Sequence, residues 1–123
     1  MAKPIFVKFE MPKELQDKAY EVVELARDSG KIKKGTNEVT KLVERGEAVL
    51  VVMAEDVQPP EILAHIPLLA EERNVAYVYV PSKLELGNAC GLSKPTASLA
   101  ILDAGKGKPV LDALIDQVKK LKK

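Results

Sequence analysis

Three short apolar runs constrain the fold of this chain more than any other feature of its sequence. The first, Ala48 to Ala54, contains no polar residue, and two further apolar runs follow at 75–80 and 97–102. An uninterrupted run that is rich in Val, as the first one is, is typical of a strand covered on both faces. The sequence therefore predicts a small, largely buried sheet that needs helices on both of its sides.

Helical patterns occupy the segments between these runs. Residues 13–28 carry an apolar stripe at i, i+4, i+7, i+8 and i+11 from Leu15, and 35–45 carry a second stripe. Two short helices are predicted at 60–65 and 67–73. A third opens with the capping pair Ser82 and Glu85 and runs through Cys90. The last helix has its apolar stripe at Leu111, Leu114, Ile115, Val118 and Leu121. Residues 31–34 predict a short edge strand, and Gly105, Gly107 and Pro109 mark a turn.

The alternation of strands and helices predicts the fold class. We expect a single α/β domain over residues 1–123, a three-layer α/β/α sandwich around a small mixed sheet. The pattern does not give the order of the strands. A length of 123 residues and an apolar fraction of 46% suit one domain with its own core. The chain ends in a lysine-rich tail that we expect to fray, Lys119, Lys120, Lys122 and Lys123.

Composition excludes several classes of protein. With one Cys and one His, the chain has no internal disulfide or Cys-rich zinc site, and no carboxylate cluster suggests another metal. The longest apolar run is too short to span a bilayer, and charged residues interrupt the N-terminus where a signal peptide would be apolar. We therefore expect a soluble, cytoplasmic monomer without metal, cofactor or membrane partner.

The net charge of +1 conceals an uneven distribution. Residues 31–45 hold five Lys or Arg against two Glu, and the tail adds four Lys, so the remainder of the chain is acidic. This distribution excludes a uniformly basic coat for nucleic acid but predicts a local basic patch. The absence of Trp, with only five Phe and Tyr residues, argues against an aromatic platform for single strands.

Catalytic motifs are missing, and three isolated residues have structural explanations. The chain contains no phosphate-binding glycine loop and no serine nucleophile elbow. We expect Cys90 to be a buried thiol and His65 a packed or capping side chain, rather than a catalytic pair. Asp56 follows a buried strand, as the acceptor of a response-regulator receiver does, but the N-terminal acidic pair of a receiver is missing. Asp56 is therefore expected to cap or orient a turn, and we expect no enzyme.

The segment Lys34-Gly35-Thr36-Asn37-Glu38-Val39-Thr40-Lys41 is the most informative in the chain. Its helical phase places Asn37, Glu38 and Lys41 on one arc, opposite the apolar residues. An amide, a carboxylate and an ammonium group match the donors and acceptors of guanine edges, and free N–H groups at a helix start favour a phosphate. The alternative is an ordinary solvated helix on which Glu38 pairs with Lys41 for about 0.2–0.5 kcal/mol. The residues alone leave both alternatives open.

This segment resembles the signature of the archaeal large-subunit ribosomal protein L-seven-Ae family, whose members bind kink-turn RNA. The resemblance extends over nearly the whole chain, in matching order and spacing. Its further blocks are Val7-Lys8-Phe9, Ala54-Glu55-Asp56-Val57, Ala64-His65-Ile66-Pro67, Tyr79-Val80-Pro81-Ser82-Lys83, Leu86-Gly87 and Ala89-Cys90-Gly91. A kink-turn has two stems separated by a short bulge, with tandem sheared G·A pairs beside it. The resemblance implies an RNA-binding protein and not an enzyme.

The resemblance also implies which residues of the signature contact RNA. Asn37, Glu38 and Lys41 match the family positions that contact the guanines of the G·A pairs. Gly35 and Thr36 match the helix start that approaches the RNA backbone.

Further contacts are implied elsewhere in the chain. Lys34 matches a phosphate contact, Lys83 a basic residue near the bent strand, and Ile62 an apolar wall beside the extruded nucleotide. The second contact loop is Leu92-Ser93-Lys94-Pro95. In this loop Lys94 replaces the Arg of related proteins, which keeps the charge and loses the planar fork.

The RNA partners that the resemblance implies are large-subunit ribosomal RNA, box C/D and H/ACA guide RNAs, and the RNA of ribonuclease P. Other core proteins of these ribonucleoproteins are implied as protein partners. Two alternatives stay open at this point. One is a related ribosomal protein that binds only ribosomal RNA, and the other is a receiver-like α/β domain with Asp56 as acceptor.

Overall fold

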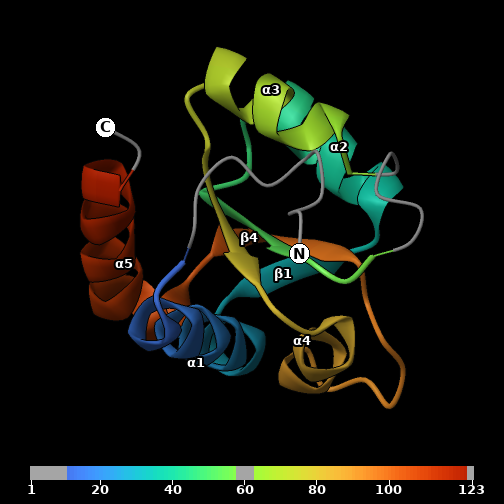
Figure 1. The fold of residues 1–123 in the computed structure, drawn as a ribbon, viewed down its shortest axis with the longest axis vertical. Helices are drawn as coiled ribbons and strands as arrows, with labels where there is room; N and C mark the ends of the chain where they lie inside the picture. Colours follow the sequence, from blue (N-terminus) through green and yellow to red (C-terminus); the bar gives the residue numbers. More distant parts are fainter. Residues whose placement is uncertain (1–10, 58–62, 122–123) are drawn as a thin grey trace.

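The structure is a computed structural model that describes residues 11–57 and 63–121 (Figure 1). In chain order its elements are α1 (Lys13–Ser29), β1 (Lys31–Lys34), α2 (Thr36–Glu44), β2 (Leu50–Ala54), α3 (His65–Glu72), β3 (Ala76–Val80), α4 (Lys83–Ala89), β4 (Ser98–Asp103), the 3₁₀ helix η2 (Gly105–Gly107) and α5 (Lys108–Leu121). The three apolar runs form β2, β3 and β4, each of which begins one or two residues later than predicted. The edge strand β1 and the helices α1, α2 and α4 are also confirmed.

The sheet of the described residues has four strands in the order β1-β4-β2-β3. β2 and β3 are parallel, whereas β4 is antiparallel to both β1 and β2. Figure 1 shows α2 and α3 on one side of the sheet and α1, α4 and α5 on the other. The predicted three-layer α/β/α sandwich around a mixed sheet is therefore confirmed.

Burial follows the apolar pattern of the sequence. All five residues of β2 are buried, as are the first four of β4. The buried residues of α1 are those of its predicted stripe, Leu15, Ala19, Val22, Val23 and Ala26. Apolar helix stripes thus cover both faces of the sheet, and the removal of this surface from water is the main contribution to stability.

Two prolines have positions that differ from the prediction. Pro67 does not open a helix, because α3 begins at His65 and includes Pro67 in its first turn, where a missing N–H breaks no helical hydrogen bond. Pro109 does not belong to a turn, because α5 begins at Lys108 and takes Pro109 into its first turn. Of the helix predicted at 60–65, residues 60–62 lie outside the described residues, while 63–64 form a turn and His65 begins α3.

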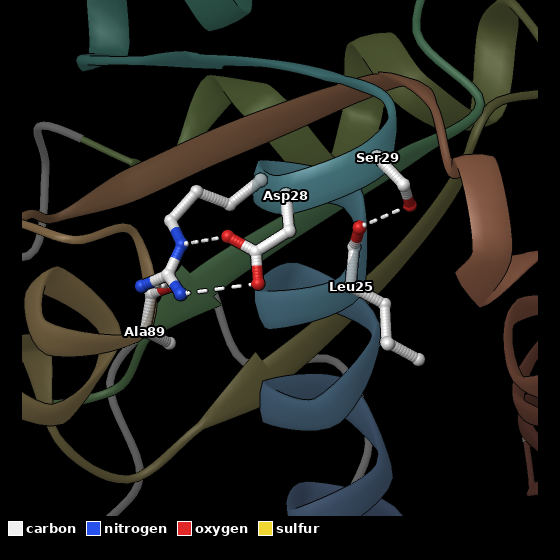
Figure 2. Close-up of polar contacts among 5 residues, drawn as sticks. Leu25, Asp28, Ser29 and Ala89 are labelled. Carbon is white, nitrogen blue, oxygen red and sulfur yellow. Dashed lines mark hydrogen bonds and ion pairs between the residues drawn. The ribbon is translucent and has the colours of Figure 1, made fainter.

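The last turn of α1 is hydrogen-bonded to two neighbouring segments, η2 and the end of α4. Figure 2 shows the bond from Ser29 to Leu25 within α1 and the approach of this turn to Ala89. Ser29 Oγ donates to the carbonyl of Leu25 at 2.6 Å and accepts from a backbone N–H of η2 at 2.8 Å. Arg27 Nη1 donates to the carbonyl of Ala89 at 3.4 Å, and Arg27 Nε lies 3.0 Å from Asp28 Oδ1. These bonds tie α1 to the segment after β4 and to the end of α4.

The C-terminal helix contains part of the lysine-rich tail. Lys119 and Lys120 lie in the last turn of α5, whereas Lys122 and Lys123 lie outside the described residues. Over residues 11–57 and 63–121, no helix has the length and the apolar character that crossing a bilayer requires.

Leu99 tests how much the buried sheet contributes to stability. Its side chain in β4 is completely buried, so Leu99→Ala leaves a cavity and should lower the free energy of unfolding by about 2–5 kcal/mol. The matched control is Leu84→Ala, because Leu84 is 53% exposed on α4, and its truncation should change stability by about 0.5 kcal/mol or less. Urea denaturation followed by circular dichroism measures both variants. Equal effects would contradict the core described above.

Candidate nucleic-acid interface

One edge of the sheet lies where three strands end and the fourth begins. The register pairs Lys34, at the end of β1, with Leu99, and Met53, near the end of β2, with Ser98 at the start of β4. β2 and β3 are parallel, so their carboxyl ends lie at this edge as well. α2 and α4 begin at this edge, and the loop before β4 ends there (Figure 1).

Three segments with predicted RNA contacts meet at this edge, and we call their residues the edge site. They are the end of β1 with α2, which carry Lys34, Gly35, Thr36, Asn37, Glu38 and, in the last turn of α2, Lys41; the start of α4 with Lys83; and the loop Leu92-Ser93-Lys94-Pro95. Ile62, the remaining predicted contact, lies outside the described residues. Segments that are far apart in the sequence are thus collected by the sheet topology.

The start of α2 is open to a ligand. Gly35 is the N-cap residue with φ 96° and ψ 138°, and no side chain caps the helix. A Cβ at Gly35 would meet no atom within 4 Å, so the space above it is open, and its positive φ favours glycine. The first N–H groups of a helix have no intrahelical acceptor and lie at the positive end of the helix dipole. This arrangement suits a phosphate group.

The exposed arc of α2 carries the polar residues, as predicted. Asn37, Glu38 and Lys41 are exposed, and the apolar residues of the helix are buried. Among the described residues, no ion pair joins Glu38 to Lys41, so the solvated pair of the alternative interpretation is not formed. The three polar groups are therefore available to donate to and accept from a ligand.

The loop Leu92–Pro95 is held against α4 by its backbone. The N–H of Leu92 donates to the carbonyl of Gly87 at 2.9 Å, and the N–H of Thr96 donates to the carbonyl of Lys83 at 3.0 Å. A Cβ at Gly87 would collide with the carbonyl oxygen of Lys94, so this close approach requires glycine. The backbone of the loop is thus fixed, while the side chains after Leu92 are exposed.

The start of α4 is fixed by two side chains. Ser82 Oγ accepts from the N–H of Glu85 at 3.2 Å, which confirms the predicted capping pair. Asp56 Oδ1 accepts from the N–H of Lys83 at 2.8 Å, so Asp56 orients the start of α4. A receiver domain is built on a parallel, doubly wound sheet, whereas this sheet is mixed. The receiver alternative is therefore wrong.

Two residues at this edge were assigned no role from the sequence. Thr96 and Ser98 are polar residues that the structure buries. The carbonyl of Ser98 accepts from the N–H of Gly35 at 3.2 Å, and Ser98 Oγ lies 3.3 Å from Thr36 Oγ1. The signal in the sequence was a serine inside the otherwise apolar run 97–102.

His65 joins α3 to the middle of α2. It is exposed, and its Nε2 lies 2.8 Å from Thr40 Oγ1. Thr40 Oγ1 donates its one proton to the carbonyl of Thr36 at 2.8 Å, so His65 Nε2 is the donor to Thr40. His65 was predicted to be packed or capping; it is instead an exposed side chain that is hydrogen-bonded to Thr40 of α2.

Cys90 is protonated at neutral pH and is not a nucleophile there. The thiol is free and buried. Burial raises its pKa to about 11, although Lys34 and Arg27 lower it in part. Within the described ranges, no group of three or more His, Cys, Asp or Glu side chains is arranged to hold a metal ion.

Comparison with known protein families identifies the relatives of this chain. The model of the Ribosomal protein L7Ae/L30e/S12e/Gadd45 family matches residues 17–110. The chain belongs to this family. The matched range of the L7Ae family contains the whole edge site, and the predicted family is confirmed, while its archaeal branch stays a prediction.

A solved structure extends the comparison beyond the range of the family model. The chain is similar to the 15.5kD RNA binding protein of Giardia lamblia, with 35% sequence identity and a TM-score of 0.89. The similarity covers 98% of this chain and 99% of that chain. The fold described above is therefore that of the L7Ae family.

The reactivity of Cys90 tests the burial of the α4 end. Because burial raises the pKa of its thiol from 9.0 to about 11, alkylation by iodoacetamide near pH 8 should be at least about tenfold slower in the native protein than in urea. The unfolded chain releases this proton first, so the free energy of unfolding should fall as the pH rises from about 9 to about 11. Mass spectrometry of the single cysteine measures the rates. Equal rates in buffer and in urea would contradict the burial.

Proposed function

We propose that this L7Ae-family protein binds RNA and recognises kink-turns, in which tandem sheared G·A pairs lie beside a bulge. The observation that carries the proposal is the edge site, where the Asn37, Glu38 and Lys41 arc and the Lys94 loop flank one edge of the sheet. The Giardia lamblia relative is described as an RNA binding protein, which supports the class of ligand.

The arc of α2 reads guanine edges in this proposal. Glu38 accepts from guanine N–H groups, Lys41 donates to O6 and N7, and Asn37 does both. A regular A-form major groove is too deep and narrow for these side chains, but a kinked junction opens it. Because a carboxylate is repelled by phosphates, Glu38 favours RNA that presents unpaired guanine donors over a plain duplex.

The remaining residues of the edge site position the RNA. Lys34, Lys83 and Lys94 hold phosphates, which fix the orientation without reading sequence. The backbone at Gly35 lies close to the same phosphate chain, and the N–H of Thr36, at the uncapped start of α2, donates to it.

The second loop and Ile62 form the apolar part of the proposed site. Leu92 and Pro95, on either side of Ser93 and Lys94, pack on the extruded nucleotide together with Ile62. The protein favours the bent RNA by its differential affinity for that state.

The proposed RNA partners are large-subunit ribosomal RNA, box C/D and H/ACA guide RNAs and the RNA of ribonuclease P, with the core proteins of these particles. The protein acts as a cytoplasmic monomer of one domain, without a cofactor or a catalytic activity. A narrower alternative is a ribosomal protein that binds only ribosomal RNA. Tight binding to a kink-turn from a guide RNA would exclude it.

A fluorescence titration with two RNAs of equal length tests the proposal. One RNA contains a kink-turn with tandem G·A pairs, and the other replaces these pairs by Watson–Crick pairs. Much tighter binding to the first that persists when salt is added supports structure-specific recognition. Equal, salt-sensitive binding to both would reduce the edge site to a generic charged surface.

Glu38→Ala tests the proposed reading of guanine. The variant should lose about 1–3 kcal/mol of binding free energy on the kink-turn and little on the duplex, because only the kink-turn presents unpaired guanine donors. Glu44→Ala is the matched control, since Glu44 is exposed at the other end of α2. The same titration measures both variants. Equal losses on both RNAs would contradict the role of Glu38.

Lys94→Ala tests the proposed phosphate contact of the second loop. Removing one phosphate contact should make the binding less dependent on salt, so that the negative slope of log K against log salt becomes shallower by about one. Lys106→Ala is the control, because Lys106 is exposed in η2, which follows the opposite end of β4. Titrations at a series of salt concentrations give the slopes. An unchanged slope in Lys94→Ala would show that this lysine does not reach a phosphate.

A further inference from the structure

The interior of this protein contains two buried hydroxyl groups beneath the edge site. They belong to Thr96 and Ser98, whose exposed fractions are 8% and 0%. Among the described residues, the other buried side chains with a polar group are those of tyrosines and Cys90. A buried hydroxyl is unfavourable unless it is hydrogen-bonded, and an apolar residue of similar size avoids this requirement. Alanine at position 98 would continue the apolar run of β4 without any polar group to satisfy.

The hydrogen bonds of these two residues connect all parts of the edge site. The carbonyl of Ser98 accepts from the N–H of Gly35 at 3.2 Å and from Thr96 Oγ1 at 3.3 Å. Ser98 Oγ lies 3.3 Å from Thr36 Oγ1 at the start of α2. The N–H of Thr96 donates to the carbonyl of Lys83 at the start of α4. The Thr96–Ser98 pair therefore links both helix starts to the loop that carries Lys94.

β4 does not need these hydroxyl groups to keep its place in the sheet. Its backbone pairs with β1 on one side and with β2 on the other. Leu99, Ala100 and Ile101 follow Ser98 in the strand and are completely buried. The hydroxyl groups add bonds only where the strand meets α2 and the loop, which is where the proposed RNA contacts lie.

We propose that Thr96 and Ser98 are positioning residues, which hold the loop Leu92–Pro95 and the first turn of α2 in one fixed arrangement. The inference rests on the proposed function. A ligand that touches two segments at once binds more tightly when both are already in place, because their ordering is not subtracted from the binding free energy. The pair determines whether Lys94 reaches its phosphate while α2 reads the guanines.

The variants Thr96→Val and Ser98→Ala, made singly and together, test this inference. Each removes a hydroxyl group while the backbone bonds remain. We expect cooperative unfolding to persist and kink-turn affinity to fall about five- to thirtyfold in the double variant. Thr96→Ser keeps the hydroxyl group and should bind like the wild type. Ile101→Val is the control for a general loss of packing, since Ile101 is buried in the same strand away from the edge site.

The decisive measurement combines these variants with Lys94→Ala. In the wild type and in Ile101→Val, Lys94→Ala should make the slope of log K against log salt shallower by about one. In the double variant its effect should be clearly smaller, because the loop and the first turn of α2 are no longer held in one arrangement that brings Lys94 to the RNA. Persistence of the full effect of Lys94→Ala in the double variant would overturn the inference.

A measurement without RNA separates this inference from the proposed function. Amide hydrogen exchange of residues 92–94 and of residue 96 should be at least about threefold faster in Thr96→Val than in the wild type and unchanged in Ile101→Val. This acceleration supports the positioning role even if the wild type shows no preference for kink-turns, a result that would refute the proposed function alone. Unchanged exchange would overturn the positioning role.

Discussion

β4 runs antiparallel to both of its neighbours, and the meeting of the loop Leu92–Pro95 with the starts of α2 and α4 depends on this pairing. In a sheet, an antiparallel strand brings its amino end to the edge at which its neighbours end. β1, β2 and β3 end at one edge, and β4 begins there. The loop before β4 therefore meets the starts of α2 and α4, which follow β1 and β3. A parallel β4 would carry this loop to the opposite edge of the sheet.

The same topology explains why this edge suits an anionic polymer. Helices that follow strands begin at the carboxyl ends of those strands, so their positive dipole ends gather at one place. Side chains cap the start of α4 but not the start of α2, which therefore offers the free N–H groups. The open space above Gly35 lets a backbone approach the start of α2. The charge on this surface is mixed, because Glu38 lies among the lysines. Such a surface binds an RNA of defined structure, as we propose, in preference to nucleic acid in general.

The edge site stands on rigid elements, although several of its members lie in loops. The loop Leu92–Pro95 is bonded to α4 through its backbone and packs on Gly87. The end of α4 is held in turn by Arg27 of α1. Asp56 fixes the start of α4 from the end of β2. Contacts of this kind reduce the ordering that a ligand must impose on a binding surface.

The sequence by itself determined the strands, the helix stripes and the exposed arc of Asn37, Glu38 and Lys41, because these depend on local periodicity and on burial. It also indicated the family, through several short motifs in matching order. Pro67 and Pro109 were misplaced because a proline is tolerated throughout the first turn of a helix, so its position alone does not mark the first residue. The direction of β4 was decided only by the tertiary structure, and so were the bond from Asp56 to Lys83 and the Thr96–Ser98 pair beneath the edge site. Each of these features joins residues that are distant in sequence or depends on the order of the strands. Local sequence patterns contain no information about either.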